Sequence, residues 1–240
     1  MTNRNEWLIP GAIILVGFIL AVSVYLLNHH ATTSSVGNVA AMRPVSSTDH
    51  IIGNPAAPVV FVEYADVDSE YAKDFEQVME QVMQTYGSGG QVAWVYRAFP
   101  LIGVDEYSEE HAEAAECVAA GAGAQNSSAA FFKFIDALQA AAPGENDFNP
   151  RGYDDVISQL GYSVTDFNTC LADGTYKSRV MADYENALAI GADGSPYTVL
   201  IVKGQSAKVI SGAVPYSTLK QVIDSAISDA LGSTTSATGN

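Results

Sequence analysis

Residues 59–75 read VVFVEYADVDSEYAKDF, and the pattern of side chains changes once along this stretch. The first half is a short apolar run rich in β-branched residues, and it follows prolines, which is typical of a buried strand. From Phe75 to Met83 the apolar residues recur at helical spacing. A strand that runs directly into a helix points the free N–H groups of the helix N-terminus at Ser69. Because many folds use such a junction for chemistry, Ser69 marks the first candidate site.

The composition is that of a globular and strongly acidic protein of 240 residues. It contains 27 Asp and Glu residues against 11 Lys and Arg residues, for a net charge of −16, and 48% of its residues are hydrophobic. Within the first 42 residues only Arg4 and Glu6 are charged, so the whole excess lies downstream. A surface of this sign repels nucleic acid and anionic lipid, which excludes nucleic-acid binding and favours cationic partners.

Residues 7–27 form an uncharged apolar run, which spans about 30 Å as a helix, the thickness of a bilayer core. A cleaved signal peptide would have a shorter apolar core that ends at a small-x-small site, and no such site adjoins this run. We therefore expect an uncleaved anchor and a single-pass protein of the cell membrane. The charge of Arg4 predicts that residues 1–6 lie in the cytoplasm and that the domain after the anchor lies outside it.

The remaining chain divides into a linker, one domain and a tail. Residues 28–47 are rich in small and polar residues without an apolar period, and we expect a flexible linker. Residues 232–240 have a similar composition and are expected to form a disordered tail. The domain between them, residues 48–231, is long enough to bury a core of its own.

Strand and helix patterns alternate along this domain. After the first strand and helix, residues 91–97 predict a second strand, and the segment from about 105 to 191 is helical throughout. Two strands joined by a hairpin turn follow, and an amphipathic helix ends the domain. The predicted helices of the middle segment are 109–122, 128–141, 153–160, 164–171 and 176–190, and the predicted later elements are strands 197–202 and 207–211 and helix 217–231.

Residues 53–66, read with Lys73 and Phe75, resemble the entry strand and first helix of DsbA-like thioredoxin-fold proteins. The resemblance covers about residues 48–231. It implies an α/β thioredoxin fold with an inserted helical subdomain, preceded here by one transmembrane helix, and the activity of a thiol–disulfide oxidoreductase. In that family the turn carries Cys-Pro-aromatic-Cys. In this sequence the same positions hold Ser69, Glu70, Tyr71 and Ala72.

The replaced turn cannot carry out dithiol chemistry. Exchange needs one thiolate that attacks and a second thiol that resolves the mixed disulfide, and neither Ser69 nor Ala72 supplies one. Asp66, Asp68 and Glu70 would disfavour a thiolate in this turn and instead suit an ordinary helix start. One interpretation of the turn is therefore a capped helix without any catalytic residue.

A second segment, Ser195-Pro196, resembles the cis-proline segment that faces the active-site turn in the same family. If the resemblance holds, the backbone of Ser195 presents an edge to which an extended peptide can add as a strand. The expected peptide groove is formed by Ser69, Glu70, Tyr71, Ser195 and Pro196. Its expected partners are extended peptides or unfolded protein segments.

The two cysteines, Cys117 and Cys170, both fall in predicted helices, where some extracytoplasmic members of the family also carry cysteines. The resemblance therefore implies a structural disulfide between them, which fits an oxidising compartment. Buried free thiols and a redox-active pair are the alternatives. Neither cysteine has the C-x-x-C spacing that activates a thiolate.

Other chemistry has little support in the sequence. A Ser69 nucleophile would need a base, for which the domain offers His50 and His111, and there is no Gly-x-Ser-x-Gly motif. No metal site and no cofactor is expected. The leading hypothesis is a peptide-binding or chaperone-like module. The alternatives are an oxidoreductase that works through Cys117 and Cys170, and a structural domain that assembles with a neighbouring membrane protein.

Overall fold

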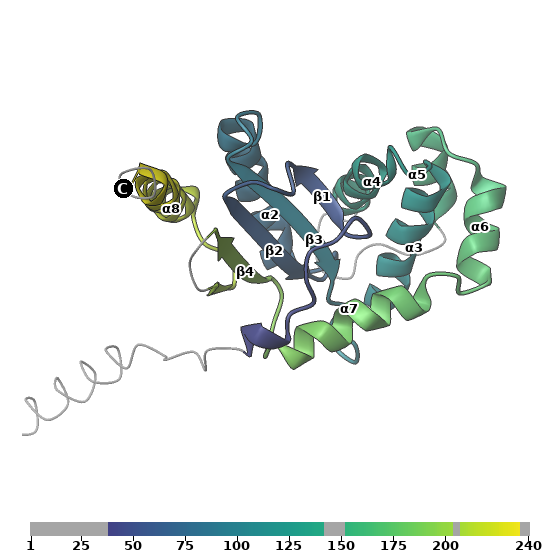
Figure 1. The fold of residues 1–240 in the computed structure, drawn as a ribbon. Helices are drawn as coiled ribbons and strands as arrows, with labels where there is room; N and C mark the ends of the chain where they lie inside the picture. The colour runs from purple at the N-terminus through teal and green to yellow at the C-terminus, as the bar shows by residue number, and fades with distance from the viewer. Residues whose placement is uncertain (1–37, 142–151, 204–206, 236–240) are drawn as a thin grey trace, which may run out of the picture. The chain divides into compact units, whose positions relative to one another are not determined.

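The computed structural model describes residues 38–141, 152–203 and 207–235 (Figure 1). The predicted membrane anchor at 7–27 lies outside these residues. Within the described ranges, no helix has both the length and the apolar character needed to cross a membrane.

A five-stranded sheet with the order β1-β3-β2-β4-β5 forms the centre of the domain. β2 and β3 are parallel, and the other neighbouring strands are antiparallel. Helix α2 connects the two parallel strands, as the strand-to-helix junction predicts, and the fold is therefore of the mixed α/β class. These elements are β1 (His50–Gly53), β2 (Val59–Ala65), α2 (Glu70–Val82), β3 (Val92–Ala98), β4 (Tyr197–Val202) and β5 (Lys208–Ser211).

The two faces of the sheet pack against different elements, because successive side chains of a strand point to opposite sides. The face that includes Phe61 packs against α2, the π-helical turn η2 (Met83–Gly87) and α8 (Tyr216–Thr235). The opposite face includes Val62 and packs against α7 (Lys177–Ala189) and the segment before β1. All seven residues of β2 are buried between these layers.

In the described part of the chain, five helices lie between β3 and β4. Their ends differ from those of the predicted segments by at most one residue, because Gly, Asn and Asp separate the periodic stretches. Figure 1 shows these helices gathered on one side of the sheet, with α7 returning toward β4. The helices are α3 (Ser108–Gly121), α4 (Ser127–Ala141), α5 (Tyr153–Leu160), α6 (Val164–Ala172) and α7.

Two other elements differ from the predictions. β1 has no counterpart among the predicted strands, because four residues are too few to show a period. α8 continues to Thr235, so it ends later than the predicted helix at 217–231 and includes the first residues of the predicted tail. Extending an existing helix adds a hydrogen bond with each residue, which allows weak helix formers in the last turn.

Buried charges hold the segment before β1 against the domain. Arg97 of β3 is 1% exposed, and its guanidinium donates hydrogen bonds to both carboxylate oxygens of Asp49, at 2.9 and 3.1 Å. It also donates to the backbone carbonyl oxygens of Arg43 and Pro44. Arg43 pairs in turn with Asp183 of α7 at 2.6 Å. The segment is thus joined to both the sheet and α7.

This attachment corrects the predicted boundary of the linker. The expected flexible linker, 28–47, includes η1 (Val39–Ala41), and Met42 and Val45 pack against the buried residues of the sheet. Residues 39–47 therefore belong to the folded domain. The local composition could not show this, because the partner Asp183 lies 140 positions away along the chain.

Candidate functional site

The turn between β2 and α2 places Ser69 at the start of a helix. Ser69 is the N-cap of α2, and its Oγ accepts a hydrogen bond from the backbone N–H of Ala72 at 3.3 Å. Glu70 lies in the first turn, where a carboxylate interacts favourably with the helix dipole. Ala72 is buried, whereas Tyr71 is 65% exposed. A hydroxyl and a methyl group therefore occupy the two positions where dithiol exchange would need thiols.

The loop before β4 lies directly against this turn. The Ser195–Pro196 peptide bond is cis, and Pro196 is buried. Ser195 Oγ accepts a hydrogen bond from the backbone N–H of Asp66 at 2.8 Å, and Ser69 Oγ donates one to the Ser195 carbonyl oxygen at 3.3 Å. Within the described residues, the backbone N–H of Ser195 donates no hydrogen bond. The structure thus brings the two predicted parts of the groove together.

The Ser69 hydroxyl is not arranged as a nucleophile. It donates to a backbone carbonyl oxygen, which cannot act as the general base that an attacking serine requires. The two candidate bases contact carboxylates instead: His111 Nδ1 lies 2.7 Å from Asp68, and His50 Nε2 lies 3.0 Å from Glu116. Within the described ranges, no three His, Cys, Asp or Glu side chains come together as a metal site would need.

Asp66 connects the turn to a third segment, the loop after β3. Its carboxylate accepts hydrogen bonds from the backbone N–H groups of Leu101 at 2.7 Å and Asp68 at 3.0 Å. Burial raises the pKa of Asp66 to about 6, and the two N–H groups oppose this shift because they stabilise the anion. The loops at Leu101 and Ser195 therefore meet at one residue, since Leu101 bonds the Asp66 carboxylate and Ser195 bonds the Asp66 backbone N–H.

Two further carboxyl groups are buried on the elements that flank the turn. Glu63 of β2 accepts a hydrogen bond from Trp94 Nε1 at 2.7 Å, and Glu76 of α2 accepts one from Gln139 Nε2 at 2.8 Å. Burial raises the pKa of Glu63 to about 8. Burial and the nearby Glu63 carboxylate raise the pKa of Glu76 well above its ordinary value. Glu63 therefore favours the neutral form at pH 7, and the pKa of Glu76 is shifted in the same direction.

Glu63 and Glu76 are absent from the residues that the sequence indicates for the site. Glu63 stands inside the apolar run of β2, and this interruption is the signal that could have identified it. Glu76 lies on the buried face of α2 that also includes Ala72 and Met79, so its helical spacing carries the corresponding signal.

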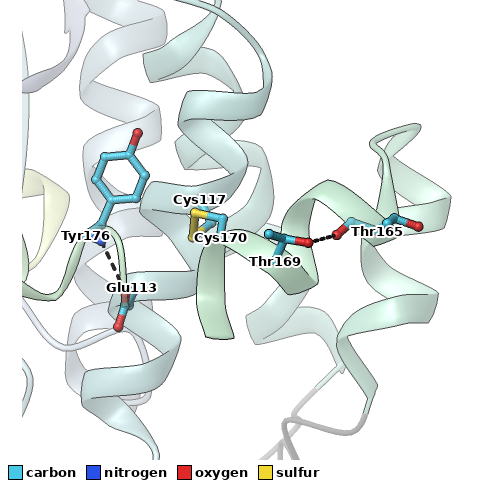
Figure 2. The surroundings of a disulfide bond; sticks show 6 residues. All are labelled: Glu113, Cys117, Thr165, Thr169, Cys170 and Tyr176. Atoms are coloured by element: carbon cyan, nitrogen blue, oxygen red, sulfur yellow. Dashed lines mark hydrogen bonds between the residues drawn. A yellow bond between two sulfur atoms is a disulfide. The ribbon is translucent and has the colours of Figure 1, made fainter. Parts of the chain in front are cut away.

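The two cysteines are joined in a disulfide between α3 and α6 (Figure 2). The Sγ atoms of Cys117 and Cys170 are 2.03 Å apart, and their Cα atoms are 5.9 Å apart. Cys117 is buried and Cys170 is half-buried. The pairing that the resemblance implies is present. It connects two helices of the inserted subdomain and involves no residue of the Ser69 turn.

Comparison with known protein families gives one match that covers most of the chain. The family model described as thioredoxin matches residues 45–225. The chain belongs to the thioredoxin family. Solved structures show that this thioredoxin-family domain has a DsbA-like fold, since it is similar to α-DsbA1 of Wolbachia pipientis with a TM-score of 0.64. That similarity spans 82% of this chain and 98% of the other, at 20% identity.

Two other solved structures have the same fold. BcfH of Salmonella enterica Typhimurium is 15% identical, with a TM-score of 0.70 over 93% of this thioredoxin-family chain and 94% of its own. BdbD of Bacillus subtilis is 19% identical, with a TM-score of 0.64 over 78% of this chain and 97% of its own. At these identities the likeness shows a shared fold and nothing beyond it.

Two curated relatives are much longer proteins. They are the Na(+)/H(+) antiporters NhaA 3 of Salinispora tropica and NhaA 1 of Salinispora arenicola. The first is 30% identical over 164 residues and the second is 29% identical over 163 residues. The matched region is 68% of this thioredoxin-family chain but 23% of each relative, so the likeness concerns one segment of the antiporters.

The raised pKa of Glu63 predicts a pH-dependent stability. The folded-state pKa, about 8, lies above the ordinary value of 4.5, so this group stabilises the fold fully below pH 4.5 and loses that contribution as the pH rises toward 8. Glu63→Gln keeps an oxygen for Trp94 and has no proton to lose. Urea unfolding should show that the variant gains more than about 1 kcal/mol over the wild type between pH 5 and pH 8.

The matched control is Glu185→Gln, which replaces an exposed glutamate of α7, on the opposite face of the sheet from Glu76. It should leave the pH dependence of the unfolding free energy unchanged. A Glu63→Gln curve that runs parallel to the wild-type curve from pH 5 to pH 8 would contradict the assignment.

Proposed function

We propose that this protein is a membrane-anchored, extracytoplasmic thioredoxin-fold protein that binds extended polypeptide segments and performs no dithiol exchange at the Ser69 turn. The observation that carries the proposal is the hydrogen bond from Ser69 to the Ser195 carbonyl oxygen, at 3.3 Å. Through this contact the turn and the loop before β4 meet as one surface. The two positions of that surface where dithiol exchange would need cysteines hold a serine and an alanine.

The residues of the turn support a binding role without redox chemistry. Exchange requires a thiolate to form a mixed disulfide and a second thiol to resolve it. The Ser69 hydroxyl cannot form that bond, and the Ala72 methyl group cannot resolve it. Asp66 and Asp68 place carboxylates in the same turn, and negative charge there opposes the formation of any further anion.

Exposed apolar side chains support the location of the proposed groove. Four large hydrophobic side chains are exposed in the described residues, and three of them belong to segments that border the turn. Tyr71 lies in the first turn of α2. Ile102 and Val104 are 43% and 80% exposed, and they follow Leu101, whose N–H binds Asp66. Exposed apolar surface of this kind is typical of interaction sites.

The backbone of Ser195 supplies the polar part of the proposed interaction. Its N–H donates no hydrogen bond within the described residues, and its carbonyl oxygen keeps one lone pair beside the bond from Ser69. An extended peptide beside Ser195 can use both groups, as an added strand does at a sheet edge. Tyr71 offers such a peptide an apolar contact.

The membrane part of the proposal is supported by the sequence of residues 7–27, which are apolar, uncharged and preceded by Arg4. The Cys117–Cys170 disulfide supports placement of the domain outside the cytoplasm, because disulfides persist in oxidising compartments.

The peptide-binding proposal predicts an effect of Tyr71→Ala. Reduced and carboxymethylated α-lactalbumin is a suitable probe, since it is permanently unfolded and has no thiols. We expect the intact chain in detergent to bind this probe non-covalently, and Tyr71→Ala to weaken the binding about tenfold, as expected for an exposed aromatic anchor. Fluorescence anisotropy with the labelled probe measures the Kd.

Leu188→Ala serves as the control, because Leu188, on α7, is the one of the four large exposed hydrophobic side chains of the described residues that does not border the turn. It should bind the probe as the wild type does. Equal Kd values for the wild type and both variants would count against the groove at Ser69.

The redox part of the proposal predicts that the wild type does not oxidise a dithiol peptide in a turnover assay. A triple variant with Ser69→Cys, Glu70→Pro and Ala72→Cys should gain activity, because the scaffold of the site is present and proline suits the first helical position. The control carries Cys117→Ser and Cys170→Ser. Wild-type turnover that this control loses would assign the chemistry to the disulfide and refute the proposal.

A second candidate function is assembly with a membrane transport protein. The observation that favours it is the pair of Salinispora antiporters, each of which contains a segment similar to this domain. A domain similar to such a segment is a candidate partner of a transport protein. Mild crosslinking of the intact chain in its native membrane, followed by purification, should recover a transport protein in a fixed ratio; a preparation without any transporter would count against assembly.

A further inference from the structure

A cavity of about 300 Å³ lies beside the Cys117–Cys170 disulfide and includes no residue of the Ser69 turn. It is bounded by the C-terminal half of α3, by α6 and by the connections on either side of α6. Figure 2 shows the disulfide between α3 and α6, with Tyr176 on a neighbouring segment. The volume is at the lower end of the range for small-ligand sites.

Aromatic rings and the disulfide form much of the cavity wall. Tyr162 precedes α6, Phe167 lies within it, and Tyr176 follows it, so the rings come from three successive segments. Tyr162 and Tyr176 are half-buried, and Phe167 is buried. Such a wall accepts an apolar stem, and the faces of its rings attract cations.

The charge of the wall comes from Asp166. Among the described residues, it is the one charged side chain that lines the cavity. Its backbone N–H is bonded to Ser163 Oγ at 3.3 Å, whereas its carboxylate takes part in no ion pair within the described part of the chain. An anionic group at the edge of an aromatic cavity is complementary to a cation that carries an apolar stem.

An acidic hollow adjoins this cavity and strengthens its preference for cations. Glu113 Oε1 accepts a hydrogen bond from the backbone N–H of Tyr176 at 3.2 Å (Figure 2), and this bond joins a residue that lines the hollow to one that lines the cavity. Lys177 is the one basic residue among the described residues that line the hollow, and it already pairs with Glu109 at 2.7 Å. The acidic side chains of this hollow of about 510 Å³ are Glu106, Glu109, Glu110 and Glu113. Their potential attracts cations toward the disulfide.

We propose that the cavity beside the disulfide binds an organic cation: a primary ammonium or guanidinium group on an apolar stem. The charged group lies at Asp166, and the stem lies among the rings of Tyr162, Phe167 and Tyr176. A free amine and a lysine or arginine side chain of a partner chain share this chemistry. The site is independent of the groove at Ser69 and of the function proposed for it.

The test is a calorimetric titration of the intact chain in detergent. The probes are 2-phenylethylamine, the carboxylate 3-phenylpropanoate, which has a similar stem and the opposite charge, and end-blocked tripeptides with a central lysine or arginine. We expect binding of the amine, of the peptides or of both, and none of the carboxylate. Binding of the amine alone assigns a free amine as the ligand, and tighter binding of the peptides assigns a partner side chain. Equal affinity for amine and carboxylate, or no binding of any cation, would overturn the proposal.

Two variants locate the binding. A Cβ at Gly121, which lines the cavity, meets no atom within 4 Å, so Gly121→Leu adds a bulky side chain at the cavity wall without displacing the backbone and improves the helix propensity. It should abolish binding while thermal unfolding stays cooperative.

Asp166→Asn should weaken binding about three- to fivefold, as expected for an exposed ion pair. Asp173→Asn removes the same charge outside the cavity lining and should have no effect. Wild-type affinity in both Gly121→Leu and Asp166→Asn would overturn the proposal.

Discussion

The complete burial of strand β2 constrains the rest of the domain. Its backbone hydrogen bonds are satisfied by β3 on one edge and β4 on the other, and buried residues cover both of its faces. A ligand therefore has no access along the strand. β2 is followed by a largely buried turn at residues 66–69, and the chain reaches the surface at Glu70 and the exposed Tyr71, where α2 begins. The candidate site lies at this end of the sheet for that reason.

The same burial determines the chemistry around the site. A carboxyl group at Glu63 has no water to stabilise its anion, so it favours the neutral form and accepts the hydrogen bond from Trp94. Asp66, at the strand end, keeps two backbone N–H partners and a smaller shift of its pKa. The neutral acid Glu63 thus lies behind the turn, and apolar side chains lie exposed around it. Such a surface suits the proposed peptide-binding role and offers no thiol to react with a bound segment.

The sequence predicts those features that have a local pattern. The helices of the inserted subdomain and the strand-to-helix junction at Ser69 follow from periodicity and from helix-breaking residues. The approach of Ser195 to Ser69 has no local signal, since 126 positions separate them, and the family resemblance alone indicated it. The attachment of residues 39–47 and the cavity beside Cys117 depend on contacts between distant segments. Such contacts arise from packing that no single stretch of sequence reveals.

The attachment of the segment before β1 also determines how the domain bears mechanical force. β1 is a four-residue strand at the edge of the sheet, and a pull applied to it directly would open its hydrogen bonds one after another. Arg43 and Asp49 precede it, and they are bonded to α7 and β3 through Asp183 and Arg97. Tension that enters from the N-terminal side therefore loads these ion pairs before it reaches β1. A domain held by that end keeps its sheet closed until the ion pairs break.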